Sequence, residues 1–268
     1  MTLKTGIKSL RCLEREETFH PVVGPSIEAK ILHVDQQKLS ERARVCKKFV
    51  IWDIGFGAAA NALAAVEALV GIDTETEIHS FDRTTAAIEF AIGHAPDLDY
   101  LNLHLETIRS LLHKRKISIT PHLTWFLHLE DFAKSLERPE LPSPHALIYD
   151  PYSPAENVEM WTLEHFRRLY RRLDPKVPCL LTNYTRSTAV RATLLMAGFF
   201  VGRGCAIGEK AETTIASNRI ELLDKPLGSH WLQTVQASSN SAPLKNPYAL
   251  ASISAAELAQ LKMAPQFN

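Results

Sequence analysis

The apolar residues of this chain form short runs that alternate with helix-favouring stretches. Residues 49–52 are apolar without alternation, a pattern typical of a strand buried on both faces of a parallel sheet. Similar runs, each followed by a helix-favouring stretch, lie at residues 77–82, 145–150 and 179–184. Residues 199–202 and 212–216 predict a closing antiparallel hairpin. Strands that alternate with helices predict a doubly wound α/β sheet.

The same pattern divides the chain into three parts. Residues 1–48 precede the first core strand and contain a Pro/Gly-punctuated loop and a helix that includes Glu28, so we expect an N-terminal extension or lid. Residues 49–217 hold the alternating strands and helices of the predicted main domain. Residues 218–268 are rich in Ser, Asn and Pro, and we expect them to pack on the domain as a tail.

Composition adds limits on partners and location. Thirty basic and thirty acidic residues cancel, so any RNA binding requires a local basic patch. The four cysteines are scattered and form no metal-ligand spacing, which favours reduced thiols of a cytoplasmic protein and no metal site. The N-terminus lacks a long apolar segment, so neither a signal peptide nor a membrane span is expected.

The strand at 49–52 leads into a glycine turn. Gly55 and Gly57 allow the backbone to approach a ligand, and the helix expected at 58–70 would present its free N–H groups there. The third glycine of a dinucleotide fingerprint is missing, and no phosphate-binding G-K-[ST] motif is present. Asp53, just before the turn, suits the amino group of S-adenosylmethionine better than a pyrophosphate. The alternative is a tight strand–helix turn that binds nothing.

Asp82 ends the second predicted strand, about 20–25 residues beyond the glycine turn, where nucleotide-binding folds place a carboxylate for ribose hydroxyls. The alternative is an N-cap for a helix over residues 84–92. The two roles are compatible.

A second chemical element is the loop Asp150-Pro-Tyr152-Ser-Pro at the end of a central strand. Ligands of open α/β sheets bind at that edge. Methyl transfer to nitrogen needs a neutral amine, and Asp150 can accept its N–H groups while Tyr152 packs on a flat acceptor and the prolines stiffen the loop. The alternative is a Pro-rich turn in which Asp150 caps the next helix and Tyr152 packs in the core.

These motifs together resemble the MnmC-like methyltransferase family. The family motif E-L-G-F-G-T-G-L-N is matched by residues 53–61, D-I-G-F-G-A-A-A-N, and D-x-F-x-P-x-x-N-P-x-x-W is matched by residues 150–161. Residues 197–199 and 204–213 match the later A-G-F and G-x-G-x-K-R-E motifs. The resemblance spans roughly residues 8–217.

The resemblance implies a Rossmann-like, seven-stranded methyltransferase that uses S-adenosylmethionine. It implies tRNA as a partner, because the family methylates 5-aminomethyl-2-thiouridine at the wobble position. The resemblance does not extend to the FAD-dependent oxidase half of MnmC, so if the tRNA pathway applies, we expect another enzyme to supply the aminomethyl group.

Site residues follow from the matched positions. Those implied to hold the cofactor are Asp53, Gly55, Phe56, Gly57, Asn61, Asp82, His128 and Glu28. Those implied to hold the acceptor are Asp150, for the amine, and Tyr152, beside the base. Three departures affect this set: Ala59 replaces a glycine of the turn, His128 lies where the family has an acid near the adenine pocket, and Tyr152 replaces a phenylalanine.

Three hypotheses remain at this point. A tRNA methyltransferase predicts a basic surface beside Asp150, for which the candidates are Lys114, Arg115, Lys116, Arg167, Arg168, Arg171 and Arg172. A methyltransferase for a small-molecule amine agrees with the zero net charge. The altered positions Ala59 and His128 suggest a non-catalytic cofactor-binding homologue.

Overall fold

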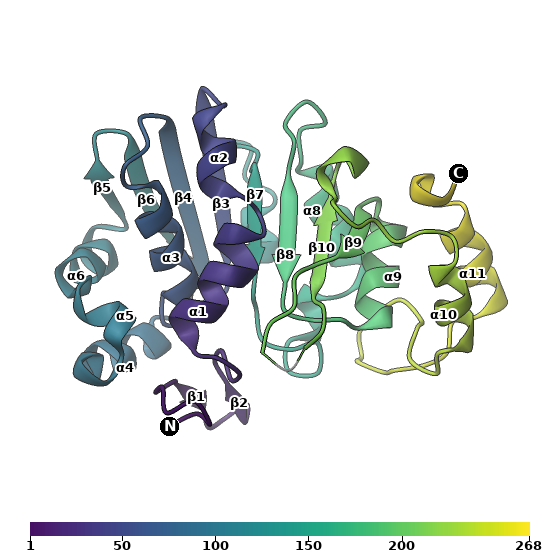
Figure 1. The fold of residues 1–268 in the computed structure, drawn as a ribbon, viewed down its shortest axis with the longest axis horizontal. Helices are drawn as coiled ribbons and strands as arrows, with labels where there is room; N and C mark the ends of the chain where they lie inside the picture. The colour runs from purple at the N-terminus through teal and green to yellow at the C-terminus, as the bar shows by residue number, and fades with distance from the viewer. Residues whose placement is uncertain (209) are drawn as a thin grey trace.

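An eight-stranded sheet forms the middle layer of the computed structural model, which describes residues 1–208 and 210–268 (Figure 1). Its strands are β3 (Lys48–Ile54), β4 (Glu75–Asp82), β5 (Lys116–Thr120), β6 (Leu123–Leu129), β7 (Ala146–Tyr149), β8 (Leu180–Asn183), β9 (Phe200–Arg203) and β10 (Thr214–Ser217). Their spatial order is β5-β6-β4-β3-β7-β8-β10-β9. The five strands from β6 to β8 are mutually parallel, whereas β5 and β10 run antiparallel to their neighbours.

Helices cover both faces of this sheet. On one face lie α1 (Pro25–Ala29), the π-helical turn η1 (Lys30–Asp35), α2 (Leu39–Arg44), α3 (Ala60–Leu69), α4 (Ala86–Gly93), α5 (Asp99–Asn102) and α6 (Leu105–Lys114). On the other face lie α7 (Phe132–Ser135), α8 (Leu163–Arg171), α9 (Thr188–Ala197), α10 (Trp231–Ala237) and α11 (Ala255–Lys262). Short 3-10 turns are η2 (Ala95–Asp97), η3 (Val158–Met160), η4 (Ile220–Leu222) and η5 (Pro265–Phe267).

The two-sided burial explains the unbroken apolar run of β3. Phe49 and Ile51 pack in the core with α3, while Val50 and Trp52 pack in the opposite core with α8 and α9. All four side chains are at most 2% exposed. An alternating polar pattern would leave polar groups buried on one face, so only a continuous apolar run suits this strand.

The sheet order creates a topological switch beside β3. The chain passes from β3 outward to β4 and β6, and then returns to form β7 on the other side of β3. Ile54 of β3 pairs with Tyr149 of β7, so Gly55 and Asp150 leave the sheet next to each other. Crevices at such switch points, beyond the carboxyl ends of the strands, are where open α/β sheets bind ligands.

Most of the predicted architecture is confirmed. The sheet is doubly wound, β9 and β10 form the predicted antiparallel pair, and the expected seven strands are present with β5 as an additional edge strand. The helical stretch between β4 and β5 is not continuous, because the chain breaks between α5 and α6. No helix in the described part of the chain is long and apolar enough to cross a membrane.

The two ends of the chain pack differently. Near the N-terminus, β1 (Arg11–Cys12) and β2 (Glu17–Thr18) form a small hairpin, hereafter the N-terminal hairpin, which lies beyond the carboxyl ends of the parallel strands (Figure 1). Toward the C-terminus, Trp231 and Leu261 are buried in the same core as α8 and α9.

Candidate active site

Gly55 and Asp150 bring the two sequence motifs into backbone contact. Gly55 has φ +94°, in the left-handed region, and a Cβ at this position would lie 2.5 Å from the carbonyl oxygen of Asp150. Only glycine combines this conformation with such a close approach. The glycine turn after β3 and the acceptor loop after β7 therefore form one structural unit.

Asn61 also connects the two motifs. Its Nδ2 donates a 2.7 Å hydrogen bond to Oδ2 of Asp150. Burial raises the pKa of Asp150 to about 7, although the bond from Asn61 and the charge of Lys210 lower it. The Oδ1 atom of Asn61 is buried without a hydrogen-bond partner among the described residues. An unpaired polar atom at this place is available to a ligand, since leaving it unsatisfied is costly.

Asp53 lies beneath the glycine turn and is fully buried. Its Oδ2 accepts a 2.7 Å bond from the Ser80 hydroxyl, which accepts a 3.0 Å bond from Nε1 of Trp125. Its Oδ1 has no partner in the described part of the chain. Burial raises the pKa of Asp53 to about 8, and the nearby Asp150 and Asp82 add to this. A cationic ligand group near Asp53 would favour its ionised form.

Asp82 holds the glycine turn in place. Its Oδ2 accepts a 2.9 Å bond from the backbone N–H of Gly57, and its Oδ1 accepts one of 3.3 Å from Thr84. The predicted helix-capping role is wrong, because the N-cap of α4 is Thr85. Burial raises the pKa of Asp82, while its hydrogen bonds oppose this. The carboxylate joins the ends of β3 and β4, which is where a ribose-binding carboxylate would stand.

The side chains of Phe56 and Ala59 point into the core. Phe56 packs edge-to-face on Trp125 at 6.1 Å between ring centres and is 3% exposed. Its contribution to a cofactor site would therefore come from its backbone. Ala59 has φ +67° at the N-cap of α3, and its methyl group is fully buried. The alanine accepts a strained conformation that a glycine would adopt freely.

Tyr152 meets the N-terminal hairpin, whose residues the sequence did not identify as part of the site. The ring of Phe19 lies 5.8 Å from that of Tyr152, and the guanidinium of Arg15 lies 4.8 Å from the Tyr152 ring centre. Glu17 accepts a 3.1 Å bond from the backbone N–H of Ser153. No motif or periodicity marks this segment, since only the tertiary structure brings it to the sheet edge.

Two of the sequence-predicted site residues, His128 and Glu28, lie apart from the glycine turn and the Asp150 loop. His128 stacks on Phe81 at 4.8 Å on the opposite face of the sheet, and burial lowers its pKa to about 4, so it is neutral at pH 7. Glu28 is buried in α1 and accepts bonds of 2.8 and 3.0 Å from the backbone N–H groups of Val22 and Val23. Its carboxylate thus links Val22 and Val23 to α1 by hydrogen bonds.

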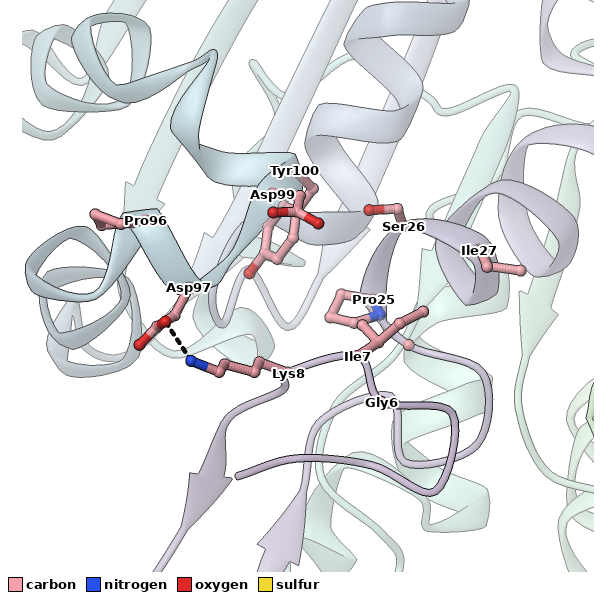
Figure 2. A pocket seen from close by; sticks show the side chains of 11 residues that line it. Gly6, Ile7, Lys8, Pro25, Ser26, Ile27, Pro96, Asp97, Asp99 and Tyr100 are labelled. Atoms are coloured by element: carbon pink, nitrogen blue, oxygen red, sulfur yellow. Dashed lines mark hydrogen bonds and ion pairs between the residues drawn. The ribbon is translucent and has the colours of Figure 1, made fainter.

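A cavity of about 360 Å³ lies elsewhere, between the N-terminal segment and α5 (Figure 2). Its walls include Gly6, Lys8, Pro25, Ser26, Asp97 and Tyr100. Figure 2 shows the Lys8–Asp97 ion pair across it. None of the sequence-predicted site residues lines this cavity.

The predicted basic residues differ in their availability. Arg168 binds Glu137 and a backbone carbonyl, Arg171 binds Glu164, and Arg172 binds two backbone carbonyls. These three side chains thus bind other groups of the protein itself. The run at residues 114–116 lies at the start of β5, where Lys116 pairs with Phe126 in the middle of β6. It therefore lies on the outermost strand, with β6, β4 and β3 between it and β7.

The residues at the switch point suit S-adenosylmethionine. Gly55 and Gly57 both have positive φ and form a turn without side chains, and Asp53 has an unsatisfied oxygen beneath it. A nucleoside with a cationic amino-acid tail needs such an open turn, a carboxylate for the ribose, whose place Asp82 would take, and a nearby negative charge. The three features come from β3, β4 and the loop between β3 and α3.

Comparison with known proteins agrees with this geometry. A family model described as S-adenosyl-L-methionine-dependent methyltransferase matches residues 99–219, which include Asp150. The tRNA 5-methylaminomethyl-2-thiouridine biosynthesis bifunctional protein MnmC of Pseudomonas fluorescens (strain Pf0-1) is 28% identical over 204 residues, 69% of this chain and 29% of that protein. MnmC of Methylibium petroleiphilum is 28% identical over 221 residues, 75% of this chain and 31% of that protein. The chain thus spans about a third or less of the length of these relatives.

The fold has a close counterpart among solved structures. The crystal structure of MNMC2 from Aquifex aeolicus superimposes with a TM-score of 0.71 and 23% identity, covering 97% of this chain and 81% of that chain. The family model and the related MnmC proteins indicate an S-adenosylmethionine-dependent methyltransferase, and the fold agrees with this class. Within that class, its sequence is related to the MnmC proteins.

Proposed function

We propose that this methyltransferase transfers a methyl group to a primary amine on a tRNA uridine, the 5-aminomethyl-2-thiouridine of the wobble position. The observation that carries the proposal is the environment of Asp150. The carboxyl is half-buried at the switch point, Asn61 holds one of its oxygens, and no described residue donates to the other. The name of the related MnmC proteins, which refers to 5-methylaminomethyl-2-thiouridine, agrees with an amine acceptor.

The chemistry places few demands on the protein beyond orientation. When bound, S-adenosylmethionine supplies a methyl group on a positively charged sulfur. The ionised Asp150 accepts an N–H bond of the amine and so directs the nitrogen lone pair away from the carboxylate. Asn61 keeps the carboxylate in one orientation, and Tyr152 offers an aromatic face to the planar base. The amine must be unprotonated, because an ammonium has no lone pair to donate.

Calorimetric titration with S-adenosylmethionine, followed by methyl transfer to tRNA that lacks the final methyl group, tests the proposal. We expect binding and transfer by the wild type. Asp150→Ala should lower turnover about 100-fold, the order of effect when one transition-state contact is removed, with the cofactor Kd changed less than threefold. Asp73→Ala, at an exposed aspartate, serves as the matched control. Equal loss of turnover and cofactor binding in Asp150→Ala would contradict the assigned role.

A small-molecule amine is the second candidate acceptor. It is favoured by the zero net charge and by the contacts of Arg168, Arg171 and Arg172 with groups of the protein itself. Cofactor binding without transfer to tRNA would support it. The salt dependence of tRNA binding separates the two candidates further. Replacing Lys114 and Lys116 with Ala should reduce the slope of log Kd against log salt if the run at 114–116 contacts phosphates.

A further inference from the structure

The N-terminal hairpin is attached to the acceptor loop by its own side chains. The backbone N–H of Ser153 donates to Glu17 at 3.1 Å, and the Arg15 guanidinium donates to the backbone carbonyl of Glu156. The hairpin itself has only two pairs of residues in register. Two-stranded hairpins of this size are marginally stable alone, so these contacts determine where it lies.

Phe19, directly after β2, reaches both motifs of the site. Its ring meets Tyr152 at 5.8 Å and an interplanar angle of 62°. Its Cε2 atom lies 3.3 Å from the position that a Cβ on Gly57 would occupy. One aromatic side chain from the N-terminal segment therefore spans the entrance between the glycine turn and the acceptor loop.

The charged groups near Phe19 and Tyr152 favour a ligand with an amine. Glu17 binds the backbone N–H of Ser153 at 3.1 Å, and its charge adds to the raised pKa of Asp150. Lys210 opposes them from the segment between β9 and β10, where its ammonium donates to the Tyr184 carbonyl at 3.2 Å. Two aromatic rings beside two carboxyl groups suit a planar ring that carries an amine.

We infer that Phe19 is an acceptor-binding residue that forms, with Tyr152, one aromatic surface against which the planar base is held. The two rings are in edge-to-face contact, with 5.8 Å between their centres, so a base packs on the outside of this pair. The inference rests on the proposed function, since it takes the acceptor to be an aminomethylated base. It extends the acceptor site to residues before the first core strand.

Three variants at this position separate an aromatic role from a packing role. Phe19→Ala removes the ring, Phe19→Leu retains apolar volume, and Phe19→Trp retains an aromatic face. Leu13→Ala is the matched control, because Leu13 belongs to the turn of the same hairpin and is 83% exposed. For each protein we would measure kcat/KM for tRNA lacking the final methyl, calorimetric affinity for S-adenosylhomocysteine, and Tm.

The expected result is a loss of about tenfold or more in kcat/KM for Phe19→Ala and Phe19→Leu, the scale of removing one base-stacking side chain. Phe19→Trp and Leu13→Ala should stay within threefold of the wild type, and S-adenosylhomocysteine affinity should change less than threefold throughout. Retained kcat/KM in Phe19→Leu would overturn the inference. Parallel loss of S-adenosylhomocysteine affinity would overturn it in favour of a cofactor-covering role. Failure of the wild type to methylate tRNA would instead refute the proposed function.

Discussion

The amide of Asn61 donates a 2.7 Å hydrogen bond to the carboxylate of Asp150, joining the first turn of α3 to the loop after β7. This bond stabilises the ionised form of a carboxyl whose pKa is raised to about 7 by burial. It therefore connects the orientation of Asp150 with the pH range in which Asp150 can accept an amine N–H.

The pH dependence of catalysis follows from this relationship. We expect kcat/KM to rise between pH 6 and 8 as Asp150 loses its proton. In Asn61→Ala the bond that lowers the pKa of Asp150 is lost, so the midpoint should move to higher pH. The substrate amine titrates identically in both assays, so the displacement between the two profiles reports on the enzyme. Superimposable profiles would show that Asp150 does not titrate in this range.

Gly55 should be irreplaceable for folding. In Gly55→Ala the new methyl group would lie 2.5 Å from the Asp150 carbonyl oxygen at a φ of +94°. We expect the free energy of unfolding to fall by about 3 kcal/mol or more, since a left-handed conformation and a backbone clash both add to the cost. Chemical denaturation measures this loss. Gly71→Ala, where an added Cβ meets no atom within 4 Å, should change stability by less than about 0.5 kcal/mol.

Gly57 should matter chiefly for the cofactor. A Cβ at Gly57 would lie 3.3 Å from the Phe19 ring, a side-chain contact that is looser than the backbone clash at Gly55. Gly57→Leu should therefore weaken S-adenosylhomocysteine binding at least tenfold, because the side chain fills the turn, while the loss of Tm stays smaller than in Gly55→Ala. Unchanged affinity in calorimetry would remove Gly57 from the cofactor site.

Protein stability should decrease as pH rises toward 8 because of Asp53. Its pKa is about 8 in the folded protein, far above the ordinary value, so the folded state retains a proton that the unfolded chain releases. Stability from this group is present at low pH and is lost as pH rises toward 8, and Asp150 acts in the same direction. Thermal unfolding should give a lower Tm at pH 8.5 than at pH 6.5, with a smaller decrease in Asp53→Asn.

The choice of pH range and a control make this measurement specific. Buried histidines with lowered pKa values, among them His33 and His165, act in the opposite direction below about pH 6.5, so the comparison begins there. Asp73→Asn, at an exposed site, should retain the wild-type decrease. An equal decrease in Asp53→Asn would show that Asp53 is not the group that titrates.

The β3 strand, the glycine turn and the Asp150 loop could be predicted from the sequence, because each depends on residues that are close together in the chain. The apolar run of β3 requires burial on both faces, and glycines at 55 and 57 permit positive φ. Asp150 stood out because an acid followed by a rigid loop ends a buried strand. The doubly wound sheet followed from alternating strands and helices, and the structure agrees.

Tertiary structure alone decided which distant groups meet. Asn61 contacts Asp150 across 89 positions of sequence because β7 returns beside β3. The N-terminal hairpin reaches Tyr152 through side-chain contacts that leave no periodic signal in the sequence. His128 has the expected position in sequence, yet alternation along β6 directs its side chain to the opposite face, where it stacks on Phe81. The sequence therefore determined strands, turns and the class of chemistry, whereas long-range packing determined which side chains complete the site.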